Sequence, residues 1–403
     1  MIANILFSSY LLFFSLTSAF AITSAVTVPL VLSVLAMISL VLGRYVVLEK
    51  GNLIDKFILT FIAIVCFSFT LAIFSTVNFS ARMNYLTSIV SVFVLYYYMP
   101  LGFMLRGSLT AGRPWLLYGF LFVCFWVFVE FFGRNFFHVN LDSLIPRKYL
   151  TEYNSTALGD FYRARGPVEE SGHLALYIVL IGGVLFSEVK GVYSNLVVFF
   201  TVFVALASLV FTFSVASFIE LPVAVFVALI VFNFKNTMSY IFNRPILAIL
   251  IMCSVLVGAW FAADFLYELI FMKLDSSSSL IDRQVRFHET FYFITNAGFL
   301  NILIGFGPGS AREFDLELVL SAYVLIFVDY GLLGLMLFVG IFLQSLLEIR
   351  KIQNYTKRFL LAVALISLMI HFFIIPNYWY PWPWFLLAYI RYSAIDASPL
   401  GRT

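Results

Sequence analysis

The chain has 403 residues, of which 63% are apolar and 19% aromatic, while only 11% are charged. Soluble domains are about 45–50% apolar, so this composition excludes an ordinary soluble protein and indicates a polytopic membrane protein. The net charge of +3 comes from Lys and Arg residues spread over loops, which serve as topology signals and form no patch for a nucleic-acid partner.

Apolar stretches long enough for membrane helices cover most of the chain. A bilayer-spanning helix needs about 20 mostly apolar residues, and the sequence divides into about twelve such stretches. We expect spans at 5–24, 27–48, 57–77, 86–105, 115–133, 172–187, 194–213, 217–233, 246–265, 320–345, 359–375 and 382–395. The predicted fold class is therefore all-α, with residues 1–403 forming a single integral membrane domain.

Charge placement predicts the orientation of these spans. Lys and Arg gather in alternate short loops, and the positive-inside rule then puts both termini in the cytoplasm. Only Arg82 falls in a short loop of the other side. The two long loops, 134–171 and 266–319, both face outside. Because long loops are uncommon without a function, we expect them to share a site.

The first long loop ends in the densest polar stretch, Arg163-Ala-Arg-Gly-Pro-Val-Glu-Glu-Ser-Gly-His-Leu-Ala175. Guanidinium groups suit a diphosphate through paired hydrogen bonds, so Arg163 and Arg165 are candidate substrate ligands. Glu170 is a candidate general base, or it pairs with an arginine as a loop clamp. His173 is a candidate partner of Glu170, although an imidazole at a helix mouth is as often a hydrogen-bonded structural residue.

The second long loop contains a predicted amphipathic helix with further candidate ligands. Its charged face carries Arg286 and Glu289, with Arg283 nearby. The helical spacing puts its apolar face at Ile281, Val285, His288 and Tyr292.

A glycine-rich turn, Gly305-Phe-Gly-Pro-Gly-Ser310, closes the second loop. Gly305, Gly307 and Gly309 would let backbone amides approach an anion closely, although the spacing matches no dinucleotide or Walker motif.

Other polar and aromatic residues receive structural interpretations. Glu220 and Asp329 lie near or within lipid depth, so each should face the interior with a partner. Arg134, Arg147 and Lys148 read as orientation signals or snorkelling side chains, whereas Glu130 and His371 read as structural. Gly331 and Gly334 permit close helix approach. The aromatic stretch 378–384 reads as an interfacial belt, in preference to a sugar-stacking platform.

These motifs together resemble those of a known family. Arg163-x-x-Gly166-x-x-x-Glu170 followed by His173-Leu-Ala175 resembles the signature Arg-x-x-Gly-x-x-x-Glu-Pro-Ser-His-x-Ala of O-antigen and exopolysaccharide polymerases, the Wzy family. The serine-rich lead into Arg283, the glycine turn and Asp329-Tyr-Gly-Leu-Leu-Gly334 follow in the family's order. Departures are Ser171 and Gly172 in place of Pro-Ser, and Val215 where such proteins often carry arginine.

The resemblance implies a glycosyltransferase of the bacterial inner membrane that joins undecaprenyl-diphosphate-linked repeat units into O-antigen, capsule or exopolysaccharide at the periplasmic face. Glu170, with His173, would activate the acceptor hydroxyl, and no metal or cofactor is required. The implied partners are the lipid-linked donor and acceptor, a chain-length regulator and a flippase. The diphosphate and glycan would be held by Arg163, Arg165, Gly166, Arg283, Arg286, Glu289, Gly305, Gly307 and Gly309.

Two other activities are alternatives to polymerisation: those of a ligase and of a carrier or flippase. O-antigen ligases, which transfer glycan to lipid A core, carry a histidine late in the second loop, where this chain has Leu320-Ser-Ala-Tyr323. Carriers and flippases for lipid-linked sugars concentrate charges at the midplane and are often built from repeats. Here the charges lie in loops and no repeat is apparent. The polymerase interpretation is therefore favoured.

Overall fold

The computed structural model describes residues 2–21, 26–43, 52–73, 79–140, 145–147, 156–157, 161–189, 192–242, 278–314 and 321–397. This part of the chain is mainly α-helical, with one short antiparallel hairpin. The hairpin strands are β1 (Thr156–Ala157) and β2 (Phe161–Tyr162). The helices are α1 (Ile2–Phe13), α2 (Val28–Leu42), α3 (Leu53–Ile73), α4 (Phe79–Phe93), the π-helical turn η1 (Val94–Tyr98), α5 (Met99–Leu105), α6 (Ser108–Phe136), α7 (Ser171–Val189), α8 (Asn195–Phe211), α9 (Val215–Phe242), α11 (Ser278–Thr295), α12 (Phe299–Ile304), α13 (Ser310–Glu313), α14 (Ala322–Lys351), α15 (Tyr355–His371) and α16 (Pro381–Asp396).

Within the described residues, five helical stretches are long and apolar enough to cross a membrane. They are Leu53–Ile73, Phe79–Leu105, Ser108–Phe136, Ser171–Glu188 and Ala322–Lys351. Shorter apolar helices occur at Ile2–Phe13, Val28–Leu42, Asn195–Phe211 and Ala216–Phe232. The expected span at 246–265 lies outside the described residues.

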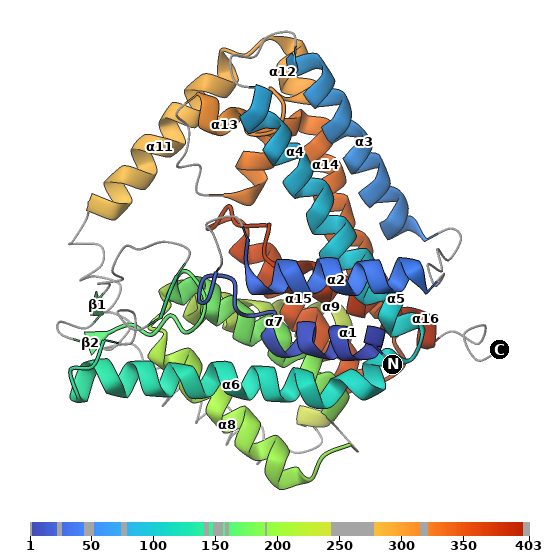
Figure 1. Ribbon diagram of the computed structural model, residues 1–403, viewed down its shortest axis with the longest axis vertical. Helices are drawn as coiled ribbons and strands as arrows, with labels where there is room; N and C mark the ends of the chain where they lie inside the picture. Colours follow the sequence, from blue (N-terminus) through green and yellow to red (C-terminus); the bar gives the residue numbers. More distant parts are fainter. Residues whose placement is uncertain are drawn as a thin grey trace.

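Two groups of helices are visible in Figure 1. In the lower part of the view α1, α6, α7 and α15 run close together, and contacts between α1 and α6 and between α7 and α15 join them. In the upper part α3 packs on α14, near α11, α12 and α13. The start of α1 and the end of α16 lie on one side of the view, and the β1–β2 hairpin lies on the opposite side.

The first helix is much shorter than the predicted span 5–24, because α1 ends at Phe13. Beyond it the backbone pairs with distant segments: the Ser18 and Ala19 amides donate to the Pro167 carbonyl at 3.2 and 3.0 Å, and Phe20 donates to Pro146 at 2.7 Å. Buried amides need a partner. Here the partner is another loop, not the helix itself, so the second half of that prediction is wrong.

Arg82 was expected in a short external loop, but it lies inside α4 with 4% of its surface exposed. Its guanidinium pairs with Glu313 of α13 at 2.6 Å and donates to the Phe306 carbonyl. A buried cation requires such partners. Arg82 therefore joins α4 to the end of the second long loop.

Helix α14 is not the single straight helix expected at 320–345. The rings of Tyr323 and Phe338 lie 6.1 Å apart, whereas 15 residues of straight helix would separate them by about 22 Å. The chain turns sharply at Gly331, which has φ 67° and ψ −168°. A Cβ there would lie 2.4 Å from the Ile304 backbone nitrogen. The predicted close approach at Gly331 is thus confirmed, although it occurs at a break in the helix.

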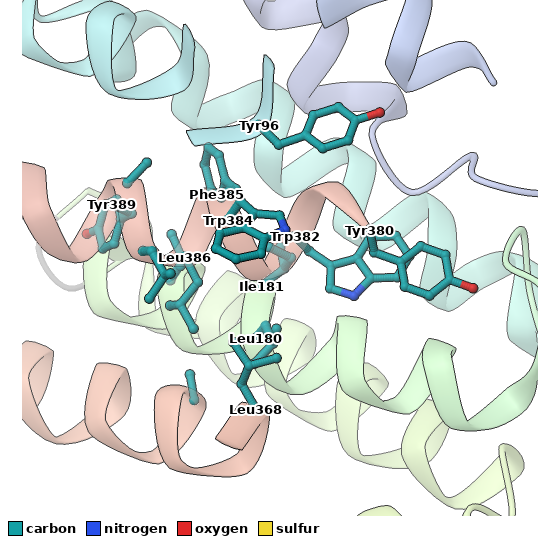
Figure 2. Close-up of a cluster of buried hydrophobic side chains, with 14 of the residues drawn as sticks. Tyr96, Leu180, Ile181, Leu368, Tyr380, Trp382, Trp384, Phe385, Leu386 and Tyr389 are labelled. Atoms are coloured by element: carbon teal, nitrogen blue, oxygen red, sulfur yellow. The ribbon is translucent and has the colours of Figure 1, made fainter. Parts of the chain in front are cut away.

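The aromatic stretch 378–384 is mostly in the core, so the prediction of an interfacial belt is wrong for all of it except Trp379, which is 36% exposed. Trp382 and Trp384 are fully buried. Figure 2 shows these rings with Tyr380 among aliphatic side chains of α7, α15 and α16. Nearly every residue of α16 is buried, as expected for a helix that is apolar on all sides.

Candidate functional site

The candidate site is built around the segment Arg163–Glu170, which we call the motif loop. The residues from Ala164 to Val168 are buried. Glu130 of α6 is 4% exposed, and its carboxylate accepts hydrogen bonds from the amides of Arg165 at 3.2 Å and Gly166 at 2.7 Å. Backbone donors stabilise a buried carboxylate strongly. Glu130, which the sequence indicated only as structural, therefore fixes the turn of the motif loop.

The carbonyls of the motif loop are paired as well. Arg147 donates to Gly166 at 2.9 Å and to Val168 at 3.1 Å, and the Pro167 carbonyl accepts the two amides from the segment after α1. Arg147 is only 8% exposed, so its interpretation as an orientation signal or snorkelling residue is wrong. Gly166 has φ 58°, and its missing side chain leaves room for Leu174. Here glycine is required by conformation as well as by packing.

Arg163 lies half-buried beside the turn between α8 and α9. Its Nε donates to the Thr212 carbonyl at 3.1 Å, and the next amide, Ala164, donates to Phe211 at 3.1 Å. Phe213 in the same turn adopts φ 43°, which is unusual for a bulky residue. The turn is therefore held in a constrained conformation next to one of the two predicted diphosphate ligands of the motif loop.

His173, predicted as catalytic, is 3% exposed and both ring nitrogens have partners. Nδ1 lies 2.9 Å from the Tyr380 hydroxyl and Nε2 lies 3.0 Å from the Asn377 amide nitrogen. Tyr380 in turn donates to Glu169 at 2.7 Å. A hydroxyl has one proton, so Nδ1 must donate to Tyr380, and Nε2 accepts from Asn377. His173 is then a neutral imidazole in one defined tautomer.

Tyr380 links this histidine to the motif loop. Burial raises the pKa of the Tyr380 phenol well above its ordinary value, and the charge of Glu169 raises it further. The phenol therefore stays protonated and remains a donor to the carboxylate. Sequence reasoning missed Tyr380 and Asn377. Both residues lie between two apolar stretches, and the many tryptophan residues around them favoured the interfacial interpretation.

The two adjacent carboxylates of the motif loop have different surroundings. Glu170 is exposed, and its carbonyl caps α7 by accepting the Leu174 amide at 3.1 Å. Glu169 is half-buried; its carboxylate accepts from Tyr380 and its carbonyl accepts from Arg165 Nη1 at 3.2 Å. Contacts beyond the motif loop therefore orient the Glu169 side chain.

A second buried acid lies close to the motif loop. Glu220 of α9 is 2% exposed and its oxygens lie 3.0 and 3.1 Å from Nδ1 of His371, which is 1% exposed. The prediction that Glu220 has an interior partner is confirmed. The His371 carbonyl accepts the Ile375 amide, and the Ile375 side chain lies beside Gly172, two residues after the motif loop.

The glycine turn differs from the predicted anion site. The Gly307 amide donates to the Asp329 carbonyl at 2.9 Å, and the Gly309 amide donates to the Asp329 carboxylate at 3.2 Å. Ser310 donates to the same carboxylate at 2.7 Å, which confirms that Asp329 has an interior partner. A Cβ at Gly305 would lie 2.4 Å from Asp329 backbone atoms. The turn therefore attaches the second loop to α14, and these amides do not point to an open anion site.

The predicted helix of the second loop is present as α11, but a different face is buried. Val285 and Tyr292 are 49% and 67% exposed, whereas Thr290 is buried and the Phe293 ring packs 4.7 Å from that of Phe306. Its apolar face was therefore predicted wrongly. The reason is that α11 buries the face that packs against the aromatic residues of the following turn.

The candidate ligands on α11 lie apart from the motif loop. Arg283 falls in this helix, Arg286 is half-buried and Glu289 is exposed. Figure 1 shows α11 separated from α7 and β2. The described residues thus bring together Arg163, Arg165, Glu169 and His173, but they do not place Arg283, Arg286 or Glu289 beside them.

Three or more His, Cys, Asp or Glu side chains suitable for one metal ion do not come together anywhere in the described residues. The chain matches no protein-family model and no curated protein sequence. The fold is mainly α-helical, and its apolar helices indicate association with a lipid bilayer. The site is a buried polar network joined to a loop that carries two arginines and two glutamates.

Proposed function

We propose that this protein is a membrane glycosyltransferase that polymerises undecaprenyl-diphosphate-linked oligosaccharide repeat units. In this proposal it crosses the bacterial inner membrane about twelve times with both termini in the cytoplasm, and the motif loop lies at the external face. The observation that carries the proposal is the motif loop itself. Arg163 is half-buried and Arg165 is 5% exposed, and the amides and carbonyls of the backbone that carries them are held by Glu130, Arg147 and Phe211.

A fixed backbone matters for this chemistry because catalysis by charge stabilisation depends on donors that are already in place. In glycosyl transfer the acceptor hydroxyl attacks the anomeric carbon of the donor. The bond from that carbon to the diphosphate oxygen breaks, and its electron pair leaves with the diphosphate. Arg163 and Arg165 would bind the anion that forms, and a carboxylate of the motif loop would take the hydroxyl proton.

The test uses purified protein with its lipid-linked repeat unit, and the glycans are separated on a gel. We expect a ladder from the wild type, single repeats from Arg163→Ala, and a partial ladder from Arg163→Lys, which keeps the charge but loses the planar fork. Lys351→Ala is the matched control, since this cation is 60% exposed and pairs only locally with Glu348 among its described contacts. Monodispersity in detergent checks that each variant is folded.

Other outcomes would replace the proposal. Transfer of finished glycan to lipid A core, without a ladder, would identify a ligase. Movement of lipid-linked repeats across vesicles without any new glycosidic bond would identify a carrier.

A further inference from the structure

The motif loop contains two adjacent carboxylates, and the family pattern points to the second, Glu170. The geometry favours the first. Glu169 is half-buried, so it can be reached from outside while its orientation is set from within. Its backbone carbonyl accepts from Arg165, which holds the main chain, and its carboxylate accepts from Tyr380, which orients the side chain. Glu170 is exposed at the start of α7.

The phenol that orients Glu169 is itself oriented. Tyr380 is 2% exposed, stacks on Trp382 at 4.5 Å between ring centroids, and lies 2.9 Å from His173 Nδ1. Asn377 contacts the other nitrogen of that imidazole. Hydrogen bonds therefore run in one direction, from Asn377 to His173, to Tyr380 and to Glu169. A base oriented by a second group, which is fixed by a third, is the arrangement that general-base catalysis requires.

We propose that Glu169 is the general base of the transfer reaction, and that Tyr380, His173 and Asn377 are positioning residues that hold its carboxylate toward the acceptor. This inference rests on the proposed glycosyltransferase function and assigns the base within it. The acceptor O–H bond breaks, its proton passes to Glu169, and its oxygen bonds to the anomeric carbon as the diphosphate leaves with the electron pair. A carboxylate offers about four acceptor positions, so a hydroxyl can bind beside the phenol.

The decisive comparison is between Glu169→Gln and Glu170→Gln in the purified assay, since the two changes are chemically identical and one residue apart. Loss of a general base typically lowers turnover about 10²–10⁴-fold. We expect a loss in that range for Glu169→Gln, and a loss at least tenfold smaller for Glu170→Gln. The opposite order would overturn the assignment.

Tyr380→Phe tests the positioning role. It removes one oxygen and keeps the ring that packs on Trp382. We expect kcat to fall about tenfold while KM for the lipid-linked donor stays within about twofold, because the phenol acts on the base and not on substrate binding. Tyr10→Phe is the matched control, since the Tyr10 hydroxyl is buried and makes no hydrogen bond within the described structure.

The outcomes separate the inference from the proposed function. Absence of a ladder from the wild type contradicts the polymerase function. A wild-type ladder that Glu169→Gln leaves intact contradicts only the assignment of the base. A Tyr380→Phe protein whose KM rises while kcat is unchanged would show that the phenol contacts substrate and does not position Glu169.

Discussion

Glu130 and Gly166 are joined by a buried hydrogen bond of 2.7 Å, in which a carboxylate near the C-terminal end of α6 holds the backbone of the motif loop. The same carboxylate accepts the Arg165 amide. Each buried donor left without an acceptor costs about 1–3 kcal/mol.

Glu130→Ala should therefore lower the melting temperature in detergent and abolish polymer formation, although Glu130 does not touch substrate in the proposed mechanism. Glu130→Gln keeps one acceptor oxygen, so its melting temperature should lie between those of Glu130→Ala and the wild type. Val129→Ala, at a 39% exposed position on the same helix, is the control for shortening a side chain of α6. Equal melting of Glu130→Ala and the wild type would refute this role.

Gly166→Ala should weaken the motif loop, because φ 58° is strained for any residue with a Cβ and the new methyl carbon would lie 3.2 Å from Leu174. The left-handed conformation alone costs about 1–2 kcal/mol. Gly298→Ala is the control, since Gly298 has φ −63° and open space around it. Thermal melting of both variants should show a lower melting temperature only for Gly166→Ala. A loss in both would point to a general sensitivity to alanine.

Gly331→Ala should be more damaging than the same change at a positive-φ glycine that has open space around it. It combines φ 67° with a Cβ that would lie 2.4 Å from the backbone between Leu303 and Gly305. Gly107→Ala separates the two effects, because Gly107 has φ 75° but nothing within 4 Å of the added carbon. We expect Gly107→Ala to cost about 1–2 kcal/mol and Gly331→Ala to prevent folding, as judged by size-exclusion chromatography. Similar profiles would mean that the break in α14 tolerates a side chain.

The pair Glu220–His371 should couple strongly. Removing one member of a buried pair costs about 3–5 kcal/mol because the other is left without its partner. Glu220→Ala and His371→Ala should each destabilise the protein, and the double variant should be little worse than either. Denaturation in mixed micelles measures the coupling.

The matched comparison for this double-mutant cycle is the pair Glu348–Lys351, whose lysine is 60% exposed. The Glu348 side chain is 3% exposed, but solvent screens the lysine, so the coupling should be smaller than that of Glu220 and His371. If the two cycles gave the same coupling, Glu220 and His371 would not behave as a buried pair.

Local apolar length was enough to predict many helices. A helix covers each of two expected spans: Ser171–Val189 covers 172–187, and Pro381–Asp396 covers 382–395. A continuous apolar stretch of that length forms a helix because every backbone group is then satisfied within the segment.

Partners distant in sequence were not predictable in this way. Arg82 binds Glu313, 231 residues away. The Phe20 amide donates to the Pro146 carbonyl and not to a carbonyl of α1. Tyr380 was missed because tryptophan and tyrosine near a span end usually mark an interface, whereas their burial depends on α16 being surrounded by other helices. The apolar character of α16 on all sides was the signal that favours burial.

The motif loop is completed by residues that lie far apart in the sequence, from Ser18 before it to Tyr380 after it. During synthesis the ribosome delivers Arg163 long before Tyr380. Until Tyr380 and α16 are in place, His173 lacks the hydroxyl that fixes its tautomer and Glu169 lacks its donor. In the proposed mechanism the base is therefore oriented only after α16 has packed, so a chain shortened before Tyr380 would carry the arginines of the motif loop without an oriented base.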